Sequence, residues 1–131
     1  MNRDRALQVV LVLVGLLFVA GIYPLVISVR SELQPDVENA LPMMLSLYVT
    51  LGIFLLLAAR NPSAHRSVIA FAAWSSFAHA AVMAVMSIQL PTQRAELLFA
   101  VAALSVVGGV LLVLAPRTQT PARGPAALPI S

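Results

Sequence analysis

The sequence predicts an all-α integral membrane four-helix bundle with its N- and C-termini in the cytoplasm. Of 131 residues, 60% are hydrophobic and only 10% are charged, and the mean hydropathy is +0.95. A soluble domain of this size buries only about two-thirds of the surface that its unfolded chain exposes, so it could not hide so many apolar side chains. This composition excludes a soluble globular domain, a disordered protein and a disulfide-stapled secreted module.

The apolar residues gather in four stretches, and each stretch is long enough to cross a bilayer as a helix. About 20 residues are needed to cross roughly 30 Å of hydrocarbon, and backbone groups in lipid must be satisfied within the segment. No Asp, Glu, Lys or Arg interrupts residues 6–29, 41–59, 67–88 or 97–115. With their caps, the predicted helices cover residues 6–29, 41–59, 64–88 and 95–115.

Short polar breaks between the helices predict antiparallel neighbours, with the second and third helices forming the core hairpin. Asn61 or Ser63 is expected to cap the third helix, and Pro62 to lie in its first turn. Pro24 should kink or end the first helix, which is too long for a cleaved signal peptide. Residues 1–116 are therefore expected to form the transmembrane domain, and residues 117–131 a disordered cytoplasmic tail.

The distribution of arginine predicts the orientation, because cytoplasmic loops are enriched in basic residues. All eight basic residues are arginine. Six of them fall in the N-terminal segment, the break near residue 63 and the tail, whereas two fall in the other two breaks. The arginines are scattered rather than gathered on one face, so we expect no nucleic-acid partner and instead contact with the lipid bilayer.

His79 is the most informative single residue because it lies near the middle of the third helix. Ionisable side chains at the bilayer midplane are candidates for function, as ligands to haem iron, proton relays or contacts to a quinone. Tyr48 lies 15 residues before Ser63 and His79 lies 16 residues after it, so the two side chains should share one depth. A hydrogen bond between them would satisfy both groups and make His79 structural.

Small residues recur at four-residue intervals, a spacing that lets helix backbones approach closely in lipid. The stripe on the third helix and its counterpart on the fourth comprise Ala72, Ser76, Ala80, Ala84, Ser105 and Gly109. These residues predict helix packing, either within one chain or between two copies.

Two other groups of residues carry weaker predictions. His65 lies 14 residues before His79 on nearly the same helix face, but it is expected at the headgroup level, and paired haem ligation would need a homodimer. Glu32, Asp36 and Glu38 are expected to be solvated rather than to bind a cation, since a hard cation takes six or more oxygen ligands. No metal site is predicted.

The segment from Arg60 to Met83, which includes RNPSAHRS and AAWSSFAHAAVM, resembles the centre of an uncharacterised (domain-of-unknown-function) family of small bacterial four-helix membrane proteins. That family is loosely DoxX-like in size and layout. The resemblance covers most of the chain apart from the tail, and it implies the fold and a focus on the third helix, but no reaction.

Three functions follow from these observations. The first is a non-enzymatic packing or interaction subunit of the bacterial inner membrane, in a homo-oligomer or a larger complex and without a cofactor. The second is a redox or pigment accessory protein that uses His79 as a haem ligand or quinone contact, with Tyr48 beside it. The third is a small transporter or channel, against which stands the absence of charge within the predicted spans.

Overall fold

The computed structural model describes residues 2–31 and 40–117, and these residues are all-helical, without strands. Four helical spans, at residues 3–30, 40–60, 66–89 and 91–114, are long and apolar enough to cross a membrane, as predicted. The elements are α1 (Arg3–Ala20), α2 (Ile22–Ser31), α3 (Ala40–Arg60), α4 (Arg66–Gln89), the 3₁₀ turn η1 (Pro91–Gln93) and α5 (Arg94–Leu114). The predicted acidic segment 32–39 and the tail from residue 118 lie outside the described residues.

The first span is interrupted at Gly21, one turn before Pro24. Proline has no N–H to donate to the carbonyl group four residues earlier, which belongs to Ala20. The N–H of Gly21 instead donates to the carbonyl oxygen of Phe18 at 3.1 Å, and the helix restarts as α2. The break predicted at Pro24 therefore lies slightly upstream and separates α1 from α2.

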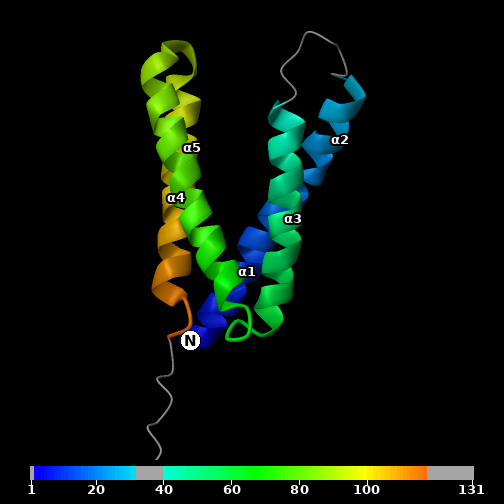
Figure 1. Ribbon diagram of the computed structural model, residues 1–131, viewed down its shortest axis with the longest axis vertical. Helices are drawn as coiled ribbons and strands as arrows, with labels where there is room; N and C mark the ends of the chain where they lie inside the picture. The colour runs from blue at the N-terminus through cyan, green and yellow to red at the C-terminus, as the bar shows by residue number, and fades with distance from the viewer. Residues whose placement is uncertain (1, 32–39, 118–131) are drawn as a thin grey trace, which may run out of the picture.

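The helices pair differently from the prediction. The extensive contacts join α1 and α2 to α3, and α4 to α5, whereas α3 and α4 touch at few positions. Figure 1 shows two hairpins that meet near the N-terminus and diverge toward the opposite end. The predicted core hairpin of the second and third spans is wrong, because the turn that joins them holds their ends together while their other contacts are sparse.

Glycines explain which helices pair closely. A Cβ atom on Gly52 of α3 would lie 2.8 Å from the carbonyl oxygen of Gly15 in α1. In the other hairpin, a Cβ atom on Gly108 of α5 would lie 3.0 Å from the carbonyl oxygen of Ala73 in α4. Backbones can approach this closely in lipid only where no side chain intervenes.

The buried apolar cluster lies where the hairpins converge. It draws side chains from all four spans: Leu7, Leu11, Val14, Phe18, Leu55, Ala58, Ala59, Ile69, Ala72, Ala73 and Leu111. Packing of these side chains joins the two hairpins at one end and leaves the other end free to diverge.

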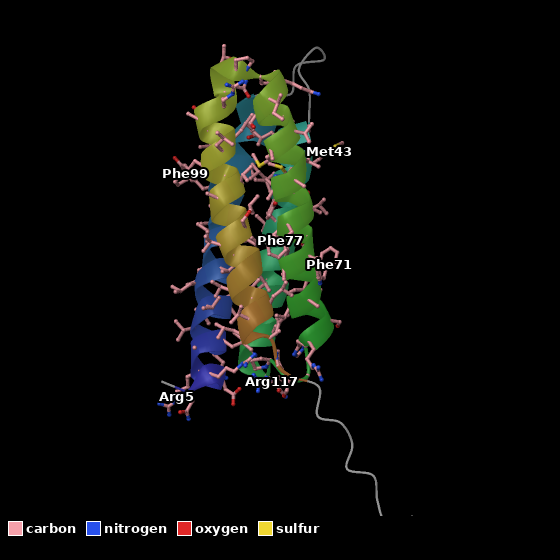
Figure 2. All side chains as sticks on the ribbon, turned by 90° about the vertical axis from the view of Figure 1, so that its left-hand side faces the viewer. Arg5, Met43, Phe71, Phe77, Phe99 and Arg117 are labelled. Carbon is pink, nitrogen blue, oxygen red and sulfur yellow. The ribbon has the colours of Figure 1, made fainter. Side chains whose placement is uncertain are left out.

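The first and last spans also meet at this convergent end. The guanidinium group of Arg3 donates hydrogen bonds to the carbonyl oxygens of Val113 and Ala115, the second at 3.2 Å. Arg5 and Arg117 lie at the same end of the bundle in Figure 2. The start of α1 and the end of α5 are therefore adjacent at this end of the bundle.

The turn between α3 and α4 differs from the predicted cap. Helix α4 begins at Arg66, and neither Asn61 nor Ser63 caps it. The Ser63 hydroxyl instead donates to the side-chain oxygen of Asn61 at 2.8 Å, and the Nδ1 atom of His65 lies 3.0 Å from the carbonyl oxygen of Asn61. These local bonds stabilise a turn over residues 61–65 and delay the helix by two residues.

Candidate binding groove between the hairpins

A groove of about 570 Å³ lies between α3 and α4, where the two hairpins diverge. This volume falls within the range of roughly 300–1,000 Å³ that is typical of small-molecule sites. The α3 side chains that line it are Met44, Leu47, Tyr48, Thr50, Leu51 and Phe54, and the α4 side chains are Ser67, Val68, Phe71, Ser75 and His79. The lining is mostly apolar, with a few polar groups.

The structure brings the predicted pair Tyr48 and His79 together across this groove. Their ring centroids lie 5.6 Å apart with an interplanar angle of 89°, an edge-to-face contact. On its other side the Tyr48 ring packs against Phe18 of α1, with centroids 4.9 Å apart. Phe18 is buried, so it fixes Tyr48 from the side away from the groove.

The predicted hydrogen bond between Tyr48 and His79 is not formed. Neither side chain has a hydrogen-bond partner among the described residues, and neither contributes a fully buried polar atom. The Tyr48 hydroxyl and at least part of the imidazole edge therefore remain accessible from the groove. An edge-to-face contact accounts for this, because it aligns the rings rather than their polar atoms.

Two neighbouring hydroxyls are satisfied by their own helices. Thr50 donates to the carbonyl oxygen of Ser46 at 2.9 Å, and Ser75 donates to that of Ala72 at 3.1 Å. Each of these bonds uses the single donor of its hydroxyl, although the oxygen can still accept. The free hydrogen-bond donors at this depth of the groove thus belong to Tyr48 and His79.

The small-residue stripe of α4 faces away from the groove. Ala72, Ser76 and Ala80 are buried, and apart from η1 the helix contacts only α5 and, sparsely, α3. Ala72 belongs to the buried cluster that joins the two hairpins, so at least this part of the stripe packs within the chain. Ala84, at the end of the stripe, is half-buried.

On α5 the close-approach glycine is Gly108 rather than the predicted Gly109. No atom lies within 4 Å of the place where a Cβ of Gly109 would be, whereas a Cβ on Gly108 would meet Phe77 at 3.0 Å. Ser105 is half-buried. Within one chain the close contact therefore lies one residue from the predicted Gly109, and one residue on a helix is a rotation of about 100°.

His65 does not join His79. It lies just before α4 in the turn after α3, fourteen residues away along the helix, or about 21 Å at 1.5 Å per residue. Within the described segments, no group of three or more His, Cys, Asp or Glu side chains could hold a metal ion. One chain therefore offers a haem only a single imidazole at the groove.

Sequence reasoning missed the groove itself, although a signal for it was present. Ser67, Phe71, Ser75 and His79 recur at four-residue intervals, one position before the small-residue stripe. This second stripe contains bulky and polar side chains. Such side chains suit a helix face that contacts a ligand better than a face that packs closely against another helix. Its partner on α3 could not be identified without knowing which helices pair.

The comparisons with known proteins identify the chain only at the level of a family. A model described as Family of unknown function (DUF6632) matches residues 2–127. No curated protein and no solved structure matches the chain. The predicted membership of an uncharacterised family is confirmed, whereas the DoxX-like resemblance stays a prediction.

Proposed function

The chain belongs to that family of unknown function, and we propose from its own structure that it is a multi-pass membrane protein which binds a lipophilic molecule in the groove between its hairpins. The ligand carries a hydrogen-bonding ring or head group, as an isoprenoid quinone does. Tyr48 and His79 contact that group, and the apolar groove walls contact the hydrocarbon chain. No catalytic residue is assigned.

One observation carries this proposal: Tyr48 and His79 present polar groups without partners to an apolar groove within the membrane-spanning helices. A polar group that faces hydrocarbon without a partner costs several kcal/mol. Neither side chain relieves this cost for the other, because the rings meet edge to face. A ligand with hydrogen-bonding atoms at this depth would relieve it.

The chemistry of the pair suits a carbonyl-bearing ring. The phenol is a donor, and neutral imidazole has one N–H donor and one acceptor nitrogen. A quinone carbonyl could accept from both donors, while Leu51 and Phe54 on α3 and Phe71 on α4 surround the ring with apolar surface. This arrangement is a contact site and requires no electron transfer by the protein.

A packing or interaction subunit is the second candidate function. The divergence of the hairpins favours it, since the facing sides of α3 and α4 could receive a partner helix. A helix of 20 residues is about 30 Å long and 10 Å wide, so it exceeds a groove of about 570 Å³ and would have to spread the hairpins. The small molecule is therefore the stronger proposal. A transporter or channel remains a prediction without such support.

We further propose the bacterial inner membrane as the location, with the N- and C-termini in the cytoplasm. The convergent end supports this orientation, because Arg3, Arg60, Arg66 and Arg117 all belong to it. Basic residues favour the cytoplasmic side of a membrane.

The test is ligand binding by the purified full-length protein. The protein in dodecyl maltoside is titrated with decylubiquinone, and unbound quinone is measured after rapid filtration. We expect saturable binding, with an affinity about tenfold lower in both Tyr48→Phe and His79→Leu, since each loses one hydrogen bond to the ligand. Trp74→Phe is the matched control, because Trp74 lies on α4, is 64% exposed and does not line the groove.

Three results would contradict the proposal. Equal quinone binding by the wild type and both groove variants would show non-specific partitioning into the micelle. A haem absorbance band in the fresh protein, lost in His79→Leu, would replace the quinone with the haem alternative. A stoichiometric protein that co-purifies, without quinone binding, would favour the packing subunit.

A further inference from the structure

A second cleft, separate from the groove, lies at the convergent end of the bundle. Its volume is about 780 Å³, and its charged lining consists of four arginines and one aspartate. Arg3 begins α1, Arg60 ends α3, Arg66 begins α4 and Arg117 follows α5. Three parts of the chain, at residue 3, residues 60–66 and residue 117, thus bring half of the chain's eight arginines to one cleft.

The described residues do not neutralise these positive charges. Asp4 is the single carboxylate among the described residues that line the cleft, so the site has a formal excess of three positive charges. Arg3 donates to carbonyl oxygens at the end of α5. Arg60, Arg66 and Arg117 have no hydrogen bond or ion pair with any other described residue.

The helix dipoles do not explain the charge of the cleft. Two helices, α1 and α4, begin there, and two helices, α3 and α5, end there. The partial positive charges at the N-termini of α1 and α4 are opposed by the partial negative charges at the C-termini of α3 and α5. The attraction for an anion therefore comes from the guanidinium groups.

We propose that this cleft binds the phosphate of an anionic phospholipid headgroup. Guanidinium groups bind phosphate oxygens through paired, charge-assisted hydrogen bonds, and basic pockets between membrane helices hold such headgroups. The cleft lies where all four spans end, which is the depth of the headgroups. Polar side chains of Gln8, Asn61 and Ser63 also line it and can contact the glycerol hydroxyls.

The location also favours a lipid over a soluble anion. The arginines terminate apolar helices, so a phosphate bound among them would be beside apolar surface such as that of the half-buried Leu114, which lines the same cleft. A lipid can place its phosphate on the arginines and its acyl chains along that surface. A free phosphate ion gains only the first of these interactions.

The experiment is native mass spectrometry of the full-length protein in detergent micelles with added cardiolipin, phosphatidylglycerol or phosphatidylcholine. We expect the two anionic lipids to bind at least about tenfold more tightly than phosphatidylcholine. The double variant R60Q/R66Q should lose roughly 10- to 30-fold in affinity for the anionic lipids. The control R5Q/R30Q removes the same charge from positions that do not line the cleft, so its affinity should stay within about threefold.

Further arms separate the remaining explanations. The variant R60K/R66K keeps the charge but not the paired hydrogen-bond geometry of guanidinium. A loss of lipid affinity intermediate between those of the wild type and R60Q/R66Q supports guanidinium recognition. This variant also keeps the proposal testable if R60Q/R66Q does not fold. Equal losses of affinity for anionic lipids in R60Q/R66Q and R5Q/R30Q would overturn the proposal, because they would show that the lipids respond to net charge rather than to the cleft. Displacement of the lipid by sodium phosphate, beyond the effect of sodium chloride at equal ionic strength, would overturn it in favour of a soluble anion.

Discussion

Gly15 and Gly52 face each other where α1 crosses α3. At each position a larger side chain would collide with the backbone of the other helix. A Cβ atom on Gly52 would lie 2.8 Å from the carbonyl oxygen of Gly15 and 2.8 Å from the Cβ atom of Phe18. A Cβ atom on Gly15 would lie 3.0 Å from the carbonyl oxygen of Gly52. Backbone atoms cannot yield as side-chain ends do, so this crossing fixes the first hairpin.

Gly52→Ala is therefore expected to destabilise the protein. The added methyl group must push two backbones apart, and overpacking of this kind costs about 1–3 kcal/mol, more than the gain of up to about 1 kcal/mol in helix propensity. The measurement is unfolding by sodium dodecyl sulfate in mixed micelles, followed by circular dichroism.

Gly109→Ala provides the matched control for that experiment. No atom would lie within 4 Å of its Cβ atom, so only the propensity gain remains, and stability should be unchanged or higher by up to about 1 kcal/mol. Equal effects of the two substitutions would refute the assignment of Gly52 to the crossing.

Ser75 and Ser76 are consecutive on α4 but face different surroundings, which gives a test of the groove. Ser75 lines the groove, whereas Ser76 is 2% exposed, at a packed interface of α4. Ser75→Trp should place its indole in the open groove, keep the fold within about 1 kcal/mol of wild-type stability and abolish quinone binding. Ser76→Trp should destabilise the protein by at least about 3 kcal/mol, because its interface has no space.

Both serine variants are measured by the same denaturation and filtration assays. The contrast between neighbouring residues excludes a general intolerance of tryptophan on this helix. If Ser75→Trp unfolded the protein as readily as Ser76→Trp, then α3 and α4 would be closely packed and the groove would not exist.

The ring contacts of Tyr48 can be separated from the role of its hydroxyl. Tyr48→Ala removes the edge contacts to Phe18 and His79, and we expect a loss of about 1–3 kcal/mol in the free energy of unfolding. Tyr48→Phe keeps both contacts and should lower the free energy of unfolding by no more than about 0.5 kcal/mol, because the hydroxyl has no partner among the described residues. A loss in Tyr48→Phe as large as in Tyr48→Ala would show that the hydroxyl is bonded within the protein.

The sequence was sufficient to predict the four spans and the shared depth of Tyr48 and His79. Span length and composition follow from the thickness of the bilayer, and the depth follows from counting residues on either side of the turn at Ser63. Both predictions rest on distances along the helix axis. The ring contact between Tyr48 and His79 agrees with that count.

Helix pairing could not be predicted in the same way, because it depends on rotation about the helix axis. In lipid, apolar residues can surround a helix, so hydrophobic periodicity does not mark the packed side. The isolated Gly15 and Gly52 in the middle of two spans were the available signal for α1 against α3. The abundance of alanine in α4 gave several candidate stripes, so Gly109 was predicted where Gly108 makes the contact.

The orientation in the membrane is tested by labelling single cysteines. The chain contains no cysteine, so one introduced thiol is a unique label without any background mutation. Ser63 is exposed in the turn at the convergent end, and Thr92 is exposed in η1 at the opposite end. With the bundle oriented by its arginines, Thr92→Cys should react with a membrane-impermeant maleimide in intact cells, whereas Ser63→Cys should react only after permeabilisation.

Both variants must react fully in permeabilised cells, which shows that each thiol is accessible in the folded protein. The reverse pattern would place the arginine-rich cleft outside and would contradict the positive-inside assignment. Reaction of both thiols from one side would contradict the spanning of the membrane by α4 itself, since this helix of 24 residues separates the two positions. The two labels together therefore test the orientation and the crossing of the membrane by α4 with one reagent, independently of any ligand.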